Sequence, residues 1–242
     1  YPLLGFNEKW VVCSGNIFNM DNGAFYGTWL YIFDKTDMLN GQDVILNQNA
    51  QIIASNDNGG SAGLAANGLP VIPMQSQGAN APMYILQNWS GSLSTIRLTT
   101  LTGNLPNVKW NIDNAIFYQG GTAWKNNWST GSSANSMPQK GDARKIAQND
   151  ARFNNAFLVN GSIWGAHTVF LGSGGTEHTA IQWWQIDPNK GIIQRSRIDD
   201  PTGKRHRCFP TIAVNKNEDV LIGYCVGQNT IYPSGAYTFR SV

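Results

Sequence analysis

The chain has 242 residues, of which 41% are hydrophobic and 13% are charged, and its formal net charge is +2. This length is sufficient to bury a full core in one domain. The small net charge and the lack of a long basic run argue against nucleic-acid binding, which depends on a concentrated cationic surface, and no apolar stretch approaches the length of a transmembrane helix.

The composition favours an all-β protein with many turns. Gly occurs 26 times and Trp 9 times, and charged residues make up about half of their usual share. No segment shows a helical period of consequence. The chain begins at Tyr1, inside an apparent strand, so we expect a processed N-terminus with sequence missing upstream, and no signal peptide is recognisable.

The first predicted element is a hairpin. Residues 1–15 (YPLLGFNEKWVVCSG) place two apolar runs around a short polar turn, and GTWLYIFDK at 27–35 adds a third strand. The same arrangement of two runs around a turn recurs at 81–101, 152–171 and 208–225. Two β-rich runs around a tight polar turn are typical of antiparallel hairpins.

Further strands follow the last two hairpins. HTAIQWWQID (178–187) and GIIQRSRID (191–199) come after the third hairpin, and IYPSGAYTFR (231–240) comes after the fourth. In AFLVNGSIW, the Asn160-Gly161 pair suits a type I′ turn because both residue types tolerate positive φ. Each unit is therefore predicted to have three or four antiparallel strands.

This repetition predicts a β-propeller of four-stranded antiparallel blades, with four to five blades visible and a larger ring as an option. A blade buries its faces only against its neighbours, so several blades are needed for stability. We expect a single propeller domain over 1–242, with blade-like units at about 1–55, 66–118, 148–200 and 205–242. A β-sandwich is the alternative, although it explains the recurrence of the same hairpin pattern less well.

Two long polar segments, 55–68 and 119–147, separate the units, and loops of this length are usually functional or mobile. SNDNGGS at 55–61 fits the core of the Asp-box turn, but the usual aromatic residue is missing, and a chance match is the alternative. We expect no cofactor and no metal, with Ca²⁺ as a further option through the oxygen atoms of loop residues. These residues are Asp21, Asn22, Asp57 and Asn58.

Tryptophan side chains are the candidate ligand-binding residues. Trp124 and Trp128 stand in the second long segment, where a core role is less natural, and we expect exposed rings there. Trp183 and Trp184 are adjacent in a strand, so one must face each side. Exposed Trp rings beside Asn and Gln suit sugar binding, because the ring stacks on C–H faces while amides bind hydroxyls. Packing between blades is the alternative.

The candidate catalytic residues are Asp150, Arg152 and His167. His167 could point into a central channel as an acid–base group, and Asp150 could belong to an Asp-based site. A structural histidine and an Asp150–Arg152 ion pair are the alternatives. His178 and His206 are expected in loops. Because Glu is scarce and no spacing marks an Arg triad, a sialidase or a Glu-based glycosidase is poorly supported.

The chain has three cysteines, and no CxxC motif or Cys/His cluster indicates a zinc site. If the last hairpin closes around KNED (216–219), Cys208 and Cys225 fall nearly opposite each other. A cross-strand disulfide would fit that geometry, and two buried free thiols are the alternative. Cys13 would then be left over.

The C-terminal stretch FPTIAVNKNEDVLIGYCVGQNTIYPSGAYTFR resembles the final blade of a secreted, largely uncharacterised bacterial family of β-propeller repeat proteins, distantly sialidase- or Asp-box-like. QKGDARKIAQNDARFNNAFLVNGSIWGAHTV and YPLLGFNEKWVVCSGNIF are similar to other blades of that family. Glu218, Cys225 and Phe239 depart from its pattern, in which Gly, Ser and Gly are expected. The matching motifs are structural, so the resemblance implies fold and secretion more than activity.

We therefore expect a secreted or cell-surface recognition module that binds a carbohydrate or an extracellular protein through loops on one propeller face. A glycan-active hydrolase or lyase, with Asp and His residues in the central funnel, is one alternative. A structural domain of a larger extracellular protein is another. Scarce Glu and the missing Arg triad favour the non-catalytic module over the enzyme, and the sequence does not indicate an oligomeric state.

Overall fold

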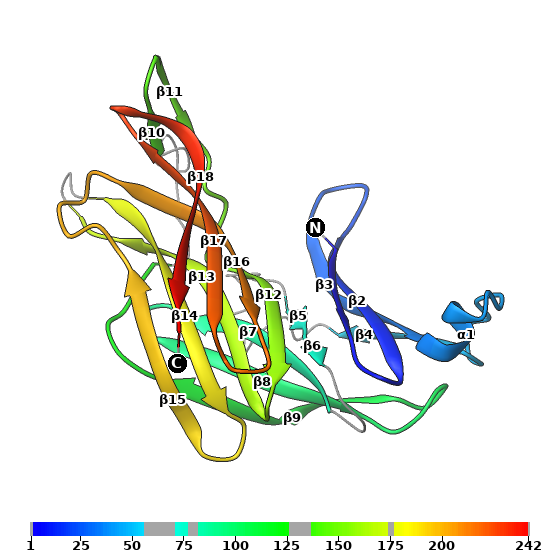
Figure 1. Cartoon of the computed structure of the whole chain (residues 1–242). Helices are drawn as coiled ribbons and strands as arrows, with labels where there is room; N and C mark the ends of the chain where they lie inside the picture. The colour runs from blue at the N-terminus through cyan, green and yellow to red at the C-terminus, as the bar shows by residue number, and fades with distance from the viewer. Residues whose placement is uncertain (1, 56–70, 77–81, 126–136, 174–176, 242) are drawn as a thin grey trace. The chain divides into compact units, whose positions relative to one another are not determined.

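The computed structural model describes residues 2–55, 71–76, 82–125, 137–173 and 177–241. Within these ranges the chain forms mainly strands, with one helix of five residues, so the predicted all-β class is confirmed (Figure 1). No helix in the described part of the chain has the length and apolar character needed to cross a membrane.

The elements follow one another along the chain as strands joined mostly by short turns (Figure 1). They are β1 (Leu3–Phe6), β2 (Trp10–Phe18), β3 (Phe25–Asp34), α1 (Lys35–Leu39), β4 (Ala50–Ser55), β5 (Ile72–Pro73), β6 (Gln75–Ser76), β7 (Met83–Ser90), β8 (Thr95–Thr102), β9 (Lys109–Gln119), β10 (Met137–Gln139), β11 (Asp142–Ile146), β12 (Phe153–Val159), β13 (Ser162–Leu171), β14 (His178–Asp187), β15 (Gly191–Ile198), β16 (His206–Val214), β17 (Val220–Gln228) and β18 (Ile231–Arg240).

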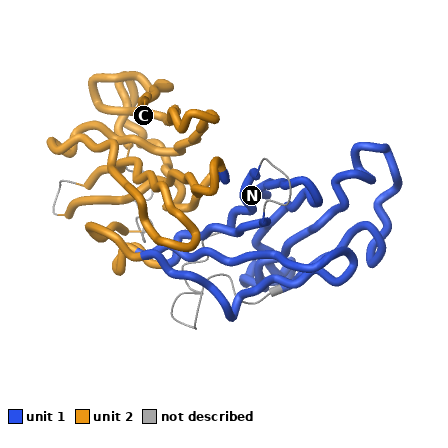
Figure 2. The backbone as a smooth tube through the Cα atoms, turned by 60° about the horizontal axis from the view of Figure 1, so that its bottom comes forward, with its two compact units in different colours: residues 1–89, 95–118, 155–158 blue, residues 90–94, 119–154, 159–242 orange. Residues whose placement is uncertain are grey.

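The chain divides into two compact units, drawn in blue and orange in Figure 2. Unit 1 comprises residues 1–89, 95–118 and 155–158, and unit 2 comprises residues 90–94, 119–154 and 159–242. The expectation of one propeller domain over the whole chain stays a prediction.

In unit 1, neighbouring strands of the first sheet follow the order β12-β6-β1-β2-β3-β4, with residues 155–158 of β12 in this unit and parallel to β6. Strands β1 to β4 are antiparallel, and β6 runs parallel to β1. Val12, Leu30 and Ile32 are fully buried on one face of this sheet. A Cβ atom on Gly5 would lie 2.3 Å from the carbonyl oxygen of Pro73, so β1 can approach the β5 segment this closely because residue 5 is glycine.

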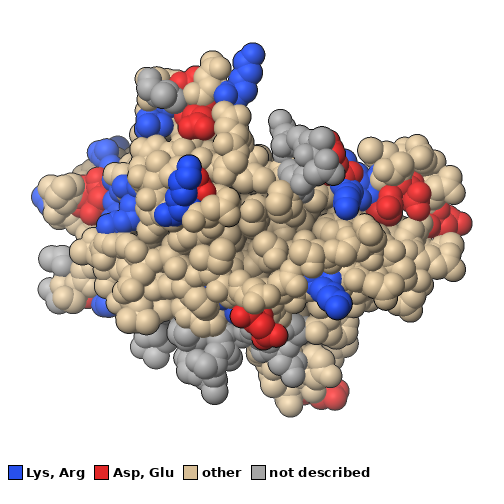
Figure 3. Space-filling view, turned by 90° about the horizontal axis from the view of Figure 1, so that it is seen from below, with Lys and Arg blue, Asp and Glu red and all other residues tan. Residues whose placement is uncertain are grey.

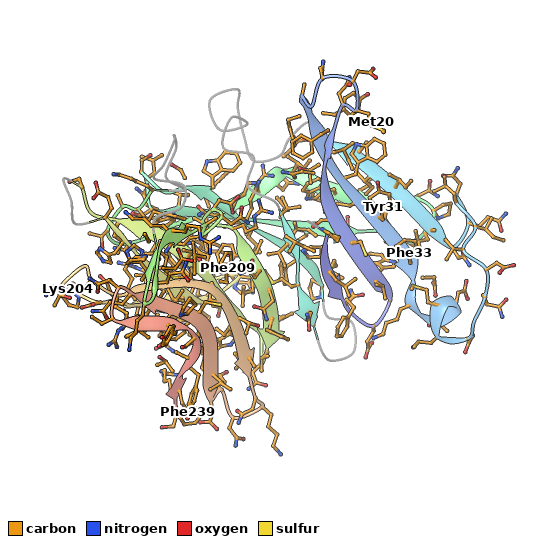
Figure 4. The ribbon with its side chains drawn as sticks, turned by 90° about the horizontal axis from the view of Figure 1, so that it is seen from above. Met20, Tyr31, Phe33, Lys204, Phe209 and Phe239 are labelled. Atoms are coloured by element: carbon orange, nitrogen blue, oxygen red, sulfur yellow. The ribbon has the colours of Figure 1, made fainter. Side chains whose placement is uncertain are left out.

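The opposite face of this sheet carries a row of aromatic side chains from β3. Trp29, Tyr31 and Phe33 alternate with the buried residues and are partly exposed, and Figure 4 labels Tyr31 and Phe33. The rings of Trp29 and Tyr31 lie 6.2 Å apart. Tyr31 is in register with Cys13 on one side and with Ile52 on the other. This face is therefore apolar and partly open to solvent.

The second sheet of unit 1 has the order β5-β7-β8-β9, and its apolar side chains share one core with the buried face of the first sheet. Met83, Ile85 and Leu101 belong to that core. The Gln51 side chain joins β4 to the segment before β9. The Gln51 Nε2 donates to the Val108 carbonyl at 2.9 Å, and the Gln51 Oε1 accepts from the Val108 amide at 2.7 Å.

Unit 2 contains the neighbouring antiparallel strands β13-β14-β15, the antiparallel sheet β16-β17-β18 and the hairpin β10-β11. Strand β13 is buried along nearly its whole length, and both β13 and β14 pack against β16. Trp164, Phe170 and Trp184 supply large buried side chains to this core. Asn160 and Gly161 have φ values of 50° and 78°, which confirms the positive φ expected at the predicted turn.

The last predicted hairpin is confirmed as well. Strands β16 and β17 pair antiparallel, with Val214 opposite Val220. Glu218, which stands where the resembled family has a turn glycine, adopts a φ of 66°. The strands predicted to follow the hairpins correspond to β3, β14, β15 and β18.

Candidate ligand-binding site

His167 lies in the interior of unit 2, surrounded by aromatic rings. Its Nε2 accepts a hydrogen bond from the Trp184 indole N–H at 3.0 Å, so the proton of the neutral ring is on Nδ1, which lies 3.1 Å from the Thr168 carbonyl oxygen. The rings of Phe153 and Trp124 lie 4.7 and 5.2 Å from the imidazole. Both ring nitrogens of His167 therefore have partners inside the core.

Burial lowers the pKa of His167 to about 3. Backbone hydrogen bonds to Thr168 and Ala151 act in the opposite direction, and the positive charge of Arg197 lowers the pKa further. Because desolvation disfavours the imidazolium form, His167 is neutral at physiological pH. A fully buried neutral histidine with two partners corresponds to the structural alternative that the sequence left open.

Asp150 and Arg152 lie beside His167, since Ala151 between them is one of its backbone partners. Arg152 donates to Asp150 through Nε at 2.7 Å and through Nη2 at 2.6 Å, and its amide donates to the same carboxylate at 3.0 Å. Both side chains are 14% exposed. The structure thus brings the three catalytic candidates together, with their polar groups engaged by one another or by the core.

The three tryptophan candidates among the described residues, Trp124, Trp183 and Trp184, are not gathered on one exposed surface. Trp124 is 4% exposed, so the expectation of an exposed ring at this position is wrong. The reason is the backbone pairing of Lys125 with Phe170 of β13, which holds the segment against the core of unit 2. Trp184 is fully buried, Trp183 stacks on another ring at 6.4 Å, and Trp128 lies outside the described residues.

His178 and His206, expected in loops, are instead the first residues of β14 and β16, and both are largely buried. His178 Nε2 lies 2.9 Å from an oxygen of Asp199. His206 Nδ1 lies 3.0 Å from the amide of Gln148. Burial, followed by the charges of His178 and Lys145, lowers the pKa of His206 to about 4. These polar contacts lie at the starts of β14 and β16, two strands that pack against each other.

Unit 1 contains an open polar cavity of about 720 Å³, which we call the acidic pocket. Four stretches of chain form it: the turn before β2, the end of β3 with α1, the turn before β4, and the turn between β8 and β9. It is lined by Glu8, Lys9, Trp10, Asp34, Thr36, Asp37, Gln48, Asn49, Asn104 and Leu105.

The turn before β2 is held by its own side chains. The Asn7 carboxamide oxygen accepts hydrogen bonds from the amides of Lys9 and Trp10 at 3.0 and 2.8 Å, which is the usual way in which Asn stabilises a tight turn. The Lys35 ammonium group donates to the Asn7 carbonyl at 2.9 Å. Glu8 and Lys9 are consequently presented at the rim of the acidic pocket, over the largely buried Trp10.

The opposite wall depends on Asn49. Its Nδ2 donates to Asp37 at 3.1 Å and to the Asp43 carbonyl at 2.9 Å, and its Oδ1 accepts from the Ile45 amide at 2.8 Å. Asp34 caps the N-terminus of α1 by accepting from the Asp37 amide at 3.0 Å. Each of the Asp34 and Asp37 carboxylates therefore has one oxygen that accepts a hydrogen bond within the described chain.

The lining of the acidic pocket carries a net negative charge. Three carboxylates face one ammonium group, and the remaining polar groups are amides and a hydroxyl. In Figure 3, acidic and basic atoms gather at the end of unit 1 that carries α1. A site of this composition can accept several hydrogen bonds from a neutral or positively charged polar ligand.

Sequence reasoning missed the acidic pocket because its residues come from separate parts of the chain. Their shared signal is modest: Asp, Glu, Asn and Gln occupy the positions just beyond strand ends, as in FNEKW, FDKTD and LNQNA. Such residues are common in turns, so the pattern alone does not separate a ligand site from ordinary turn chemistry.

The cysteine and metal expectations have separate outcomes. Cys208 and Cys225 are in register across β16 and β17, as predicted, and both are free thiols. Of the residues considered for Ca²⁺, Asn22 accepts a turn hydrogen bond from Ala24, while 57–58 lie outside the described residues. No group of three or more His, Cys, Asp or Glu side chains suited to a metal ion occurs in the described part of the chain.

Comparisons with protein-family models, with curated proteins and with solved structures found no match. The functional argument therefore rests on the acidic pocket itself.

Proposed function

We propose that this protein is a secreted or cell-surface recognition module that binds neutral or amino sugars in the acidic pocket of unit 1. The observation that carries this proposal is the lining of that pocket: three carboxylates and three carboxamides around a concave space of about 720 Å³. Sites for small polar ligands are concave and use a few convergent polar groups to fix orientation. The volume lies in the ordinary range for such sites.

The side chains of the acidic pocket match the chemistry of a sugar. Neighbouring hydroxyl groups of a sugar are paired donors, and a carboxylate accepts two hydrogen bonds without giving any back. Carboxamides such as those of Gln48 and Asn104 both donate and accept, so they can complete the set around a hydroxyl group. Asn49 fixes the Asp37 carboxylate in place, which lowers the entropy lost when a ligand binds.

Charge selects among sugars. With three carboxylates against Lys9, the acidic pocket repels sialic acids, uronic acids and sulfated sugars, and it attracts an amino sugar carrying an ammonium group. The proposed ligand is therefore a neutral or basic sugar, which specifies the carbohydrate expected from the sequence.

A catalytic role receives less support. The Asp150 and Arg152 side chains are paired with each other, and His167 is neutral and enclosed by aromatic rings. These groups suit packing better than proton transfer, because a general acid or base must reach the reacting atom.

The proposed module is a β-propeller exposed to the extracellular space. Support comes from the order of the strands: the runs β1-β2-β3-β4, β7-β8-β9, β13-β14-β15 and β16-β17-β18 follow one another in the chain and correspond to the four predicted blade-like segments. Successive runs of three or four neighbouring strands are the units from which a propeller is built.

The test is a glycan array followed by titration calorimetry with the best-bound glycan. We expect neutral or amino glycans to be bound and sialylated ones to be rejected. Glu8→Gln and Asp34→Asn remove a charge with little change in shape, and Asn also serves as an N-cap. Each change should weaken binding by about tenfold or more, since a hydrogen bond to a charged group is worth roughly 1.5–3 kcal/mol.

Asp21→Asn is the matched control, because Asp21 is an exposed acid of unit 1 that does not line the acidic pocket. Its affinity should equal that of the unmodified protein. Preference for acidic glycans, a blank array, or unchanged affinity in both pocket variants would each contradict the proposal.

A further inference from the structure

Two thiols stand in register on neighbouring strands of unit 2. Cys208 in β16 is paired directly with Cys225 in β17, and both are free. Directly opposed residues of antiparallel strands have Cα atoms about 4.5 or 5.5 Å apart, depending on the pair type, and their side chains leave the same face. Both separations fall inside the range of about 4.4–6.8 Å that disulfides span.

The two thiols differ in their access to solvent. Cys225 is exposed, whereas Cys208 is fully buried. Burial raises the pKa of Cys208 to about 12, and the nearby Cys225 thiolate adds to that increase. The influence of Cys225 on this pKa is consistent with two neighbouring sulfur atoms. An oxidant from solution therefore meets Cys225 first, with Cys208 behind it.

The strand carrying Cys208 is irregular directly after this residue. The register between β16 and β17 shifts between Cys208 and Thr211, which leaves one extra residue on β16. Phe209, labelled in Figure 4, has a φ of 53° and a partly exposed ring. Such a bulge bends its strand and interrupts the ladder, so β16 can adjust locally without breaking the pairing from Thr211 onward.

We propose that Cys208 and Cys225 form a reversible cross-strand disulfide, which makes this sheet a redox modification site for small-molecule disulfides such as glutathione disulfide. The Cys225 thiol gives up its proton and attacks one sulfur of glutathione disulfide, whose S–S bond breaks and releases one glutathione. The Cys208 sulfur then attacks the sulfur of Cys225 in the mixed disulfide and releases the second glutathione. Two protein thiols are oxidised, one glutathione disulfide is reduced to two thiols, and the two protons end on those thiols.

Cys13 provides the internal comparison. It lies in β2 of unit 1, where its neighbours in register are Leu4 and Tyr31. No cysteine stands opposite it in the sheet, so a small-molecule disulfide can form at most a mixed disulfide there.

The experiment equilibrates the folded protein with glutathione buffers of increasing oxidised fraction, blocks the remaining thiols with N-ethylmaleimide at low pH, and maps the tryptic peptides by mass spectrometry. Trypsin cuts after Arg207 and Lys216 and thus separates the two cysteines onto peptides 208–216 and 217–240. We expect these two peptides to become joined, with the loss of two hydrogen atoms. Reduced glutathione should separate them again.

Two controls make the result specific. Cys13→Ser should leave the joined peptides unchanged, and Cys225→Ser should leave Cys208 labelled only after unfolding. In urea, where the register is lost, the three cysteines should instead give a mixture of all pairings. The proposal is overturned if the folded protein gives that same mixture, if Cys225 stops at the mixed disulfide with glutathione, or if both peptides are still labelled separately under oxidising conditions.

Discussion

The tripeptide Asp-Ala-Arg occurs twice within eleven residues, and unit 2 uses its two copies differently. In both copies the Arg amide and guanidinium group donate to the Asp two residues earlier, at closely similar distances. Arg144 and Asp142 are 86% and 31% exposed, whereas Arg152 and Asp150 are both 14% exposed. The local geometry is the same in the two copies, and the surroundings differ.

The comparison shows how burial determines the contribution of an ion pair to stability. The Arg144 side chain holds the pKa of Asp142 below its usual range through its hydrogen bonds, but this pair stands in water on the two-stranded β10-β11 hairpin. The second pair lies over the buried Ala151, which contacts His167 in the core. Exposed ion pairs contribute little to stability because water and salt screen them, while sheltered ones are costly to break.

The largest expected effect comes from truncating Trp184, whose ring donates a hydrogen bond to His167 in the core near the Asp150–Arg152 ion pair. Trp184→Ala deletes a fully buried ring and leaves the Nε2 atom of His167 without its donor. We expect a loss of about 3–5 kcal/mol in the free energy of unfolding, measured by urea denaturation. Trp184→Phe keeps most of the ring and should cost clearly less. Equal losses in the two variants would mean that the hydrogen bond, not the packing, holds this core together.

The two copies can be compared directly by Arg152→Ala and Arg144→Ala. Arg152→Ala leaves the Asp150 carboxylate in a sheltered position without its cation, and we expect a loss of roughly 2 kcal/mol. Arg144→Ala should leave the denaturation midpoint unchanged, because that side chain is almost fully exposed. The comparison fails if the two variants lose the same stability.

Lowering the pH should also reduce the free energy of unfolding, because the buried His167 takes up a proton more readily in the unfolded chain. The folded-state pKa of His167 is about 3, below the unfolded value of about 6.5, so the unfolded chain takes up this proton first. The stability contribution of His167 is therefore full above the unfolded pKa and declines as the pH falls toward the folded one, by about 1.4 kcal/mol at pH 5.5. His206, with a pKa of about 4, adds in the same direction.

The measurement is the free energy of unfolding between pH 7.5 and about 5. In His167→Gln the decline with falling pH should be smaller, whatever the stability at neutral pH. A slope identical to that of the unmodified protein would show that His167 does not titrate on unfolding.

Local features of this protein could be predicted from the sequence because they depend on residues close together in the chain. Alternating apolar runs gave the strands, Asn160-Gly161 gave a turn with positive φ, and the hairpin around 215–219 placed Cys208 opposite Cys225. Each of these follows from backbone geometry and from side chains a few positions apart.

Burial and the assembly of the candidate site were decided by the tertiary structure. Trp124 occupies a Gly- and Asn-rich segment that the sequence predicts as an exposed loop, yet its ring is buried because the adjacent Lys125 pairs with Phe170 of β13. The acidic pocket joins Glu8 to Asn104 across almost a hundred residues of chain. The physical reason is that desolvation and electrostatic potential depend on every segment packed nearby, and a sequence window contains only one of those segments.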